Sequence, residues 1–326
     1  MPEVTLVEAV NMALAHEMAA DENVMVLGED VGINGGVFRA TVGLQQRFGS
    51  ERVIDTPLAE SLICGVAIGM AAQGLRPVAE IQFMGFIYPC VDQLANHAAR
   101  LRNRTRGRLS CPMVLRAPFG GGIHAPEHHS ESTEAMLAHV PGLRVVVPSS
   151  PGRAYGLLLA AIRDPDPVVF LEPKRVYRLV KQNVPDDGET QPLDVCFTLR
   201  EGTDVTLVTW GAVTHETMQA AEQLAKDGVS AEVIDVATVK PLDTETIVDS
   251  VAKTGRCVIV HEAALSCGVG AEIAAQLAEK GLLNLLAPVR RVTGYDTVMP
   301  LFKLEDHYMP SVDRILAAAR ETMEYA

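Results

Sequence analysis

Glu60 is the residue whose surroundings most strongly suggest chemistry. It is the only charged side chain between Asp55 and Arg76, in a stretch that is otherwise typical of a buried helix. At the start of a surface helix, the helix dipole would stabilise a carboxylate by about 0.3–1 kcal/mol. Burying a carboxylate costs several kcal/mol unless it gains a specific partner. Two interpretations therefore stay open on this pattern alone: an acid that simply begins a helix, and an acid that shares or takes a proton from a ligand.

A second group of candidates lies in the loop APFGGGIHAPEHHSES, residues 117–132. The segment HAPEH matches the H-x-x-E-H pattern of one class of zinc hydrolases, which places both histidines on one helix face. Pro126 lies between His124 and His128, directly after three glycines, and this disfavours a regular helix. A loop that presents a histidine for proton transfer near neutral pH is the favoured interpretation. Solvated surface histidines remain the alternative for His124 and His128.

Strand and helix patterns alternate along the chain, and these elements must position the candidates. Thr5 and Glu8 have the spacing of a capping box before a helix, and Thr56 followed by Pro57 is typical of a second helix start. Apolar strands are predicted near residues 24–30, 76–83, 113–124, 143–150 and 167–173, with a helix at about 91–102. Strands separated by helices indicate a mostly parallel sheet that is covered on both faces.

A polar segment divides the chain into two parts. Residues 178–203 are polar, with Pro, Asp and Gly clustered in their middle, and we expect a linker at 184–202. The alternation of strands and helices restarts after it. The sequence therefore predicts an α/β protein with one domain at 1–183 and another at 203–326, each with a mostly parallel sheet flanked by helices.

Composition argues against several kinds of partner. With 28 basic and 41 acidic residues the chain carries a formal charge of −13, which would repel nucleic acids and anionic membranes. The longest uncharged apolar run, residues 61–75, is shorter than the roughly 18 residues that indicate a membrane span. The six cysteines are scattered without a Cys-x-x-Cys pair, and no targeting signal is evident at the N-terminus. We expect a cytoplasmic protein with no nucleic-acid or membrane partner.

Seven segments together resemble one enzyme family. They are VLGEDVG (26–32), DTPLAES (55–61), AEIQFMGFIYPCVDQLANHAA (79–99), the GGG…EHHSES loop, PGLRVVVPSSP (141–151), TWGAVTHETMQAA (209–221) and HEAALSCGVGAEI (261–273). In this order they resemble the β subunit of thiamine diphosphate-dependent 2-oxoacid dehydrogenases, the decarboxylating first component of pyruvate and branched-chain 2-oxoacid dehydrogenase complexes. The resemblance implies two transketolase-like domains: a pyrimidine-binding domain at 1–183 and a transketolase C-terminal domain at 203–326.

The resemblance also implies roles for residues in the first domain. Glu60 occupies the place of the acid that contacts the ring nitrogen of the cofactor's aminopyrimidine, where sharing a proton activates the cofactor. Leu58, Gln82 and Phe86 would line the pyrimidine pocket. Phe86 stands where relatives often have Tyr, so it would offer stacking area without a hydroxyl group. Glu29 would lie on an acidic, water-filled path between paired active sites.

His129 is the candidate that the resemblance selects from the histidine loop. It would lie near the substrate carboxylate or assist transfer of the acyl group to lipoamide. A monovalent cation, potassium, is implied near the turn that contains Ala161, Asp164 and Asp166.

The absence of two motifs implies a partner chain. Enzymes of this kind hold the diphosphate and a magnesium ion through Gly-Asp-Gly and a downstream Asn-Asn, and neither occurs in the 326 residues. We therefore expect an α subunit that holds magnesium and the diphosphate, in an assembly of two α and two β chains with cofactor at each α/β interface. The family resemblance adds docking of a lipoyl acyltransferase, through its subunit-binding domain, to the C-terminal domain.

Substrate and role stay open between several alternatives. Pyruvate and branched-chain 2-oxoacids rank nearly level as substrates, and acetoin ranks third. Two interpretations from other classes are a zinc hydrolase that uses His124 and His128 and a non-catalytic scaffold that only recruits the acyltransferase. The scaffold predicts that neither Glu60 nor His129 affects the rate.

Overall fold

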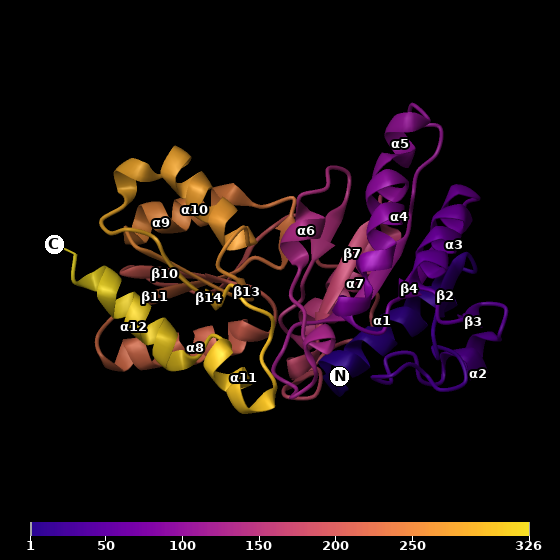
Figure 1. Ribbon diagram of the computed structural model, residues 1–326, viewed down its shortest axis with the longest axis horizontal. Coiled ribbons are helices and arrows are strands. Elements are labelled where there is room, and N and C mark those ends of the chain that lie inside the picture. Colours follow the sequence, from indigo (N-terminus) through magenta and orange to yellow (C-terminus); the bar gives the residue numbers. More distant parts are fainter. Residues whose placement is uncertain (1, 326) are drawn as a thin grey trace. The chain divides into compact units, whose positions relative to one another are not determined.

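The chain folds into two compact units, which a computed structural model describes over residues 2–325 (Figure 1). The first unit comprises residues 2–119 and Met136–Leu193, and the second comprises Gly120–Ala135 and residues 194–325. The division at Leu193 falls inside the segment for which we expected a linker. Sequence order places the loop Gly120–Ala135 in the first domain, whereas its contacts group it with the second unit.

The first unit is built on a parallel sheet. Its strands lie in the order β6 (Arg144–Val146), β7 (Val168–Pro173), β5 (Val114–Phe119), β4 (Arg76–Glu80), β2 (Val24–Gly28) and β3 (Val53–Asp55). Each neighbouring pair is parallel. Strands β5 and β7 are buried along their whole length, because helices cover both faces of such a sheet.

Helices α1 (Leu6–Ala20), α3 (Glu60–Ala72) and α7 (Pro151–Arg163) are the longest in this unit, and α1 packs against α7. The expected capping box is present before α1: the backbone N–H of Thr5 donates to Glu8 Oε2 over 2.8 Å. Strands β1 (Glu3–Thr5) and β8 (Lys181–Asn183) form an antiparallel pair. Shorter helices are α2 (Leu44–Phe48), α4 (Val91–Asn96) and α5 (Leu101–Arg104); α6 (Glu134–Ala138) begins in the second unit and continues into the first.

Two helix predictions need correction. The helix expected at 91–102 is interrupted by a 3₁₀ turn at Ala98–Arg100 between α4 and α5. Helix α3 begins at Glu60, four residues after the expected start at Thr56, and Glu60 is therefore its first residue.

The second unit has its own, mostly parallel sheet. Its order is β14 (Arg290–Gly294), β13 (Cys257–Ala264), β10 (Val205–Thr209), β11 (Ala231–Asp235) and β9 (Phe197–Arg200), with only β9 antiparallel to its neighbour. Strand β9 shows that part of the expected linker is regular structure. The remaining elements are β12 (Thr238–Lys240), α8 (Thr214–Lys226), α9 (Thr244–Thr254), α10 (Val269–Lys280), α11 (Phe302–Tyr308) and α12 (Val312–Met323).

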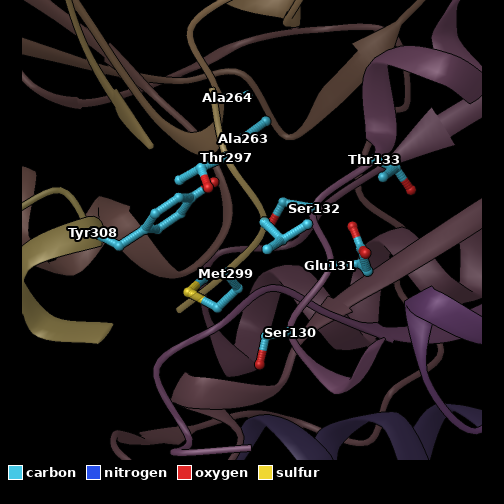
Figure 2. A pocket seen from close by; sticks show the side chains of 10 residues that line it. Ser130, Glu131, Ser132, Thr133, Ala263, Ala264, Thr297, Met299 and Tyr308 are labelled. Atoms are coloured by element: carbon cyan, nitrogen blue, oxygen red, sulfur yellow. The ribbon is translucent and has the colours of Figure 1, made fainter. Parts of the chain in front are cut away.

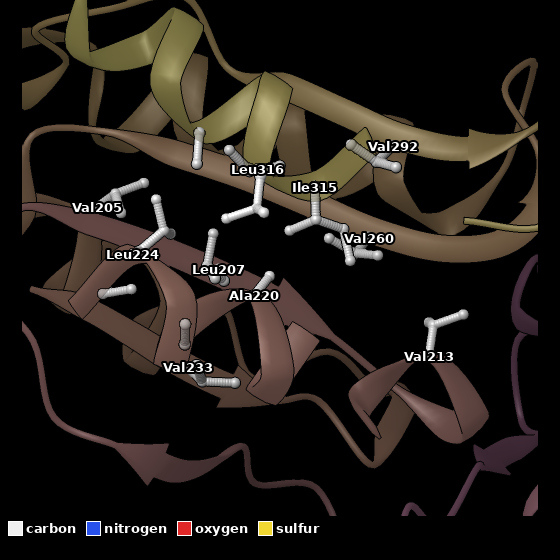
Figure 3. Packing of buried hydrophobic residues seen from close by; sticks show 14 residues of the cluster. Val205, Leu207, Val213, Ala220, Leu224, Val233, Val260, Val292, Ile315 and Leu316 are labelled. Atoms are coloured by element: carbon white, nitrogen blue, oxygen red, sulfur yellow. The ribbon is translucent and has the colours of Figure 1, made fainter. Parts of the chain in front are cut away.

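Helices cover both faces of this second sheet. Helices α8 and α12 pack together on one face, and α9 and α10 lie on the other (Figure 1). Leu207 and Val260 on the strands meet Leu224 of α8 and Ile315 of α12 in a wholly buried core (Figure 3). The predicted α/β class, with mostly parallel sheets flanked by helices, is confirmed. No helix within residues 2–325 has both the length and the apolar character needed to cross a membrane.

Candidate active site

Two neighbouring strands of the first unit, β2 and β3, end at the edge that carries Glu60. Strand β2 ends at Gly28 and leads into Glu29, and β3 ends at Asp55 and leads into the start of α3. The Asp55 carboxylate accepts backbone N–H groups of Gly32 (2.6 Å) and Ile33 (3.2 Å), which ties the loop after β2 to the end of β3. The carboxyl edge of a parallel sheet is where α/β proteins bind their ligands.

Glu60 is half-buried rather than enclosed. Its backbone carbonyl accepts the Cys90 thiol over 3.2 Å. The expectation that the following helix is buried on all sides is wrong: Ile63 and Cys64 are buried, whereas Leu62 is 47% and Val66 44% exposed. Helix α3 therefore packs through one face and presents an apolar face to its surroundings.

Glu29 is more deeply buried than Glu60. It is 8% exposed, and within the part of the chain that the structure describes its Oε1 is a buried oxygen without a hydrogen-bond partner. Burial, followed by the negative charges of Glu60 and Asp30, raises the pKa of the Glu29 carboxyl. The two acids thus interact electrostatically, and Glu29 keeps a proton to higher pH than an ordinary glutamate. Such a pair can exchange protons with a ligand or with water.

The expected pyrimidine-lining residues follow strands β3 and β4. Leu58 is 80% exposed and lies just before α3. Gln82 and Phe86 follow β4 and are half-buried. The ring of Phe86 packs edge-on against Phe83, with ring centroids 5.7 Å apart. An exposed apolar side chain therefore follows the same strand as Glu60, and an amide and an aromatic ring follow β4, which lies on the other side of β2.

His129 belongs to the second unit. It is half-buried and ends the short 3₁₀ helix Glu127–His129, in which its backbone N–H donates to the carbonyl of Pro126 over 2.9 Å. His128 is exposed, as expected for a solvated side chain. The zinc-helix alternative is wrong, because His124 has left-handed backbone geometry (φ +57°) and its ring pairs with Glu305. No group of three or more potential ligands within residues 2–325 could hold a metal ion.

The residues that follow His129 line a cavity. Ser130, Glu131, Ser132 and Thr133 form one wall of a space of about 260 Å³ (Figure 2). The opposite wall is formed by the end of β13, the segment before α11 and the last residue of α11: Ala263, Ala264, Thr297, Val298, Met299 and Tyr308. Sequence reasoning did not assign this second wall to a site, since it comes from segments at least 130 positions away along the chain.

Glu134, Trp210 and His261 form a buried polar cluster in the second unit that sequence reasoning also missed. The Trp210 indole N–H donates to Glu134 Oε1 over 3.3 Å, and its ring stacks on His261 with centroids 5.0 Å apart. Burial raises the pKa of Glu134 to about 8 and lowers the pKa of His261 to about 4. Both groups are therefore mainly uncharged at neutral pH.

A pH-dependent stability follows for Glu134. Because its pKa is raised by folding, its stabilising contribution is complete below the unfolded pKa near 4.5 and is lost as the pH rises through about 8. Glutamine has the shape of a neutral glutamate but does not ionise. In Glu134→Gln, the free energy of unfolding measured by urea titration should therefore fall less between pH 5 and pH 9 than in the wild type. The exposed Glu127→Gln is the matched control, and an unchanged slope in Glu134→Gln would contradict the assignment.

Arginine side chains bind the polar groups of the turn near which we expected a monovalent cation. Asp164 pairs with Arg144 over 2.9 Å, and Asp166 pairs with Arg102 over 2.7 Å. The carbonyl of Ile162 accepts Arg76 over 2.8 Å. The carboxylates of this turn are thus already neutralised, and a monovalent cation here would depend on backbone carbonyl oxygens.

Comparison with known proteins places these features in a family. The transketolase pyrimidine-binding domain matches residues 2–180, and the transketolase C-terminal domain matches residues 196–315. The pyruvate dehydrogenase E1 component subunit β of Bacillus subtilis (strain 168) is 49% identical over 325 residues, and that of Staphylococcus aureus (strain Mu50) is 48% identical, each across 100% of both chains.

The fold has a counterpart among solved structures. A split-gene transketolase, described as an inactive β4 tetramer, superposes with a TM-score of 0.82 at 24% identity and covers 99% of each chain. Together with the full-length sequence matches, this means that the chain belongs to the family of pyruvate dehydrogenase E1 β subunits, in which a transketolase pyrimidine-binding domain precedes a transketolase C-terminal domain.

Proposed function

We propose that this chain acts with an α subunit to decarboxylate pyruvate on thiamine diphosphate and to pass the acetyl group to a lipoyl acyltransferase. The observation that carries the proposal is Glu60, a half-buried carboxylate at the carboxyl edge of a parallel sheet, inside the part that matches the pyrimidine-binding domain. The full-length likeness to pyruvate dehydrogenase E1 β subunits supports the choice of reaction.

The residues at this edge suit one end of the cofactor. Glu60 would hold a proton at the ring nitrogen of the aminopyrimidine, and the ring of Phe86 would offer stacking area. Leu58 and Gln82 would complete the pocket with an apolar and an amide contact. When bound, thiamine diphosphate supplies the carbon nucleophile and the electron sink for decarboxylation.

Two further residues have proposed roles. Glu29, whose buried Oε1 lacks a partner within residues 2–325 and whose pKa is raised, would store and return a proton beside Glu60. His129 would contact the substrate carboxylate or assist acyl transfer, since an imidazole exchanges protons near neutral pH. We assign pyrimidine binding to residues 1–183 and acyltransferase docking to residues 203–326.

Partner chains are part of the proposal. The chain lacks the Gly-Asp-Gly and Asn-Asn motifs, so the α subunit would hold magnesium and the diphosphate. The exposed apolar residues Leu62 and Val66 lie four apart on one face of α3, and such exposed apolar surface commonly marks an interface. We propose two α and two β chains in a cytoplasmic assembly, with potassium bound through backbone carbonyls at the turn 161–166.

A panel of 2-oxoacids tests the proposed reaction. This chain alone should show no decarboxylation, and mixing with its α subunit should restore it. Pyruvate should be preferred over 3-methyl-2-oxobutanoate in kcat/KM, because each extra methylene that a pocket excludes is worth roughly 10–200-fold. A preference for the branched substrate would overturn the choice of pyruvate while leaving the cofactor chemistry standing.

A further inference from the structure

The glycine loop before His129 has a backbone shape that few sequences could adopt. Gly120, Gly122 and His124 have φ values of +85°, +82° and +57°, so alternate residues are left-handed. At Gly121 an added Cβ would lie 2.4 Å from the Met299 methyl carbon. Glycine is thus required both for backbone conformation and for close approach to the rest of the second unit.

Two buried carboxylates bind the N–H groups of this loop. Glu262 accepts the N–H of Gly121 over 3.1 Å. Glu305, which is 1% exposed, accepts the N–H groups of Gly122 (2.6 Å) and His124 (2.8 Å). Backbone in which left-handed residues alternate forms a concave nest that binds anions. Here the anion is a side chain of the same chain, supplied by helix α11.

Glu305 has one further contact in the loop. Its Oε2 lies 2.8 Å from Nδ1 of the exposed His124 ring. The carboxylate therefore engages three donors on two loop residues, and hydrogen bonds to a charged acceptor are roughly twice as strong as neutral ones. This contact offsets the strain of the left-handed His124.

The loop then closes on itself around His129. The N–H of Gly120 donates to the carbonyl of Glu131 over 2.9 Å, and Ser130 N–H donates to the carbonyl of Glu127 over 2.9 Å. His129 thus lies in a loop that the bond between Gly120 and Glu131 closes. Glu305 binds the first part of this loop through the Gly122 and His124 N–H groups.

We propose that Glu305 is a positioning residue for His129: by binding the Gly122 and His124 N–H groups, it fixes the loop that presents the imidazole. The kinetic part of this inference rests on one of the two roles proposed for His129, its assistance of acyl transfer to lipoamide. A displacement of about 1 Å in such a group costs on the order of 100-fold in rate.

Glu305→Gln in the assembled α/β enzyme tests the proposal. An amide cannot accept at both ends, so the Gly122 and His124 amides should exchange hydrogen roughly 10-fold faster or more, as expected for losing a bond to a charged group. Acyl transfer to lipoamide should slow by roughly 10–100-fold, whereas decarboxylation with an artificial electron acceptor should stay within about twofold. The exposed neighbour Asp306→Asn is the matched control and should change neither.

A double variant separates positioning from general stability. If Glu305 acts through His129, Glu305→Gln combined with His129→Ala should transfer acyl groups no more slowly than His129→Ala alone. The proposal would be overturned if the double variant transferred acyl groups more slowly than His129→Ala. It would also be overturned if Glu305→Gln left amide exchange unchanged or slowed decarboxylation as much as acyl transfer. If His129→Ala itself transfers at the wild-type rate, the proposed function of His129 fails, while amide exchange still tests the nest.

His124→Ala provides a second route if Glu305→Gln does not fold. It removes only the ring contact from an exposed position and leaves both backbone donors. The Gly122 amide should then exchange faster than in the wild type, by a smaller factor than in Glu305→Gln. No change in that exchange would show that the contact does not hold the loop.

Discussion

Replacing Glu60 by Gln should lower the decarboxylation rate of the assembled α/β enzyme by about 10²- to 10⁴-fold, the range that a positioned proton-transfer group contributes. Gln keeps the size and shape of the side chain but cannot take a proton. Assembly with the α subunit and the free energy of unfolding should therefore change little. The measurement is steady-state decarboxylation of pyruvate together with size-exclusion chromatography of the mixed subunits.

Asp92→Asn is the matched control for this experiment. Asp92 is an exposed acid in the first turn of α4, so it shares with Glu60 the favourable position near a helix N-terminus. Its replacement should leave the rate within about twofold, as expected for a surface substitution. Full turnover by Glu60→Gln would reject the catalytic role. If Glu60→Ala and His129→Ala were both without effect, the scaffold interpretation would replace the catalytic one.

The second large effect is expected from Arg116→Met in the first sheet. Arg116 is 1% exposed and binds Glu80 over 2.8 Å and Glu172 over 2.6 Å, from strands on either side of β5. The Tyr177 hydroxyl also donates to Glu172, over 2.6 Å. Removing the only cation of this group of four leaves two carboxylates buried side by side. We expect a loss of about 3–5 kcal/mol in the free energy of unfolding, measured by urea denaturation.

Compensating changes show whether the network is the cause. Burial raises the pKa of Glu80 even with Arg116 present, so this acid is already costly to ionise. Adding Glu80→Gln and Glu172→Gln to Arg116→Met should recover much of the loss, because the buried negative charges are removed. The exposed Arg108→Met should change stability by less than about 0.5 kcal/mol. A similar small change in Arg116→Met would mean that water reaches the network.

Much of the fold could be predicted from local pattern. Continuous apolar runs gave the parallel strands, since strands covered on both faces need no alternation. Thr5 and Glu8 predicted the first helix start because a capping box depends on residues only three apart. The seven matching segments predicted the family, and the full-length relatives confirm it.

Local pattern failed where neighbours from elsewhere decide the structure. Leu62 and Val66 are apolar, so the sequence suggested a helix buried on all sides, yet they are exposed in the folded chain. The apolar character of a helix face does not show whether that face packs against the rest of the same chain or lies on the surface of the folded chain. Residues 56–59 form an irregular connection with a bend after β3, so the helix begins at Glu60 rather than at Thr56.

The sequence by itself determined which residues we propose for the chemistry: Glu60, Glu29 and His129 stand in motifs whose residue types suit proton transfer. Only the tertiary structure decided what holds them. Glu305 lies more than 180 positions from the glycine loop, and Trp210 stacks on His261 because β10 and β13 are neighbours in one sheet. Such contacts depend on strand order and register, which join residues far apart in the chain and leave no trace in any short stretch of sequence.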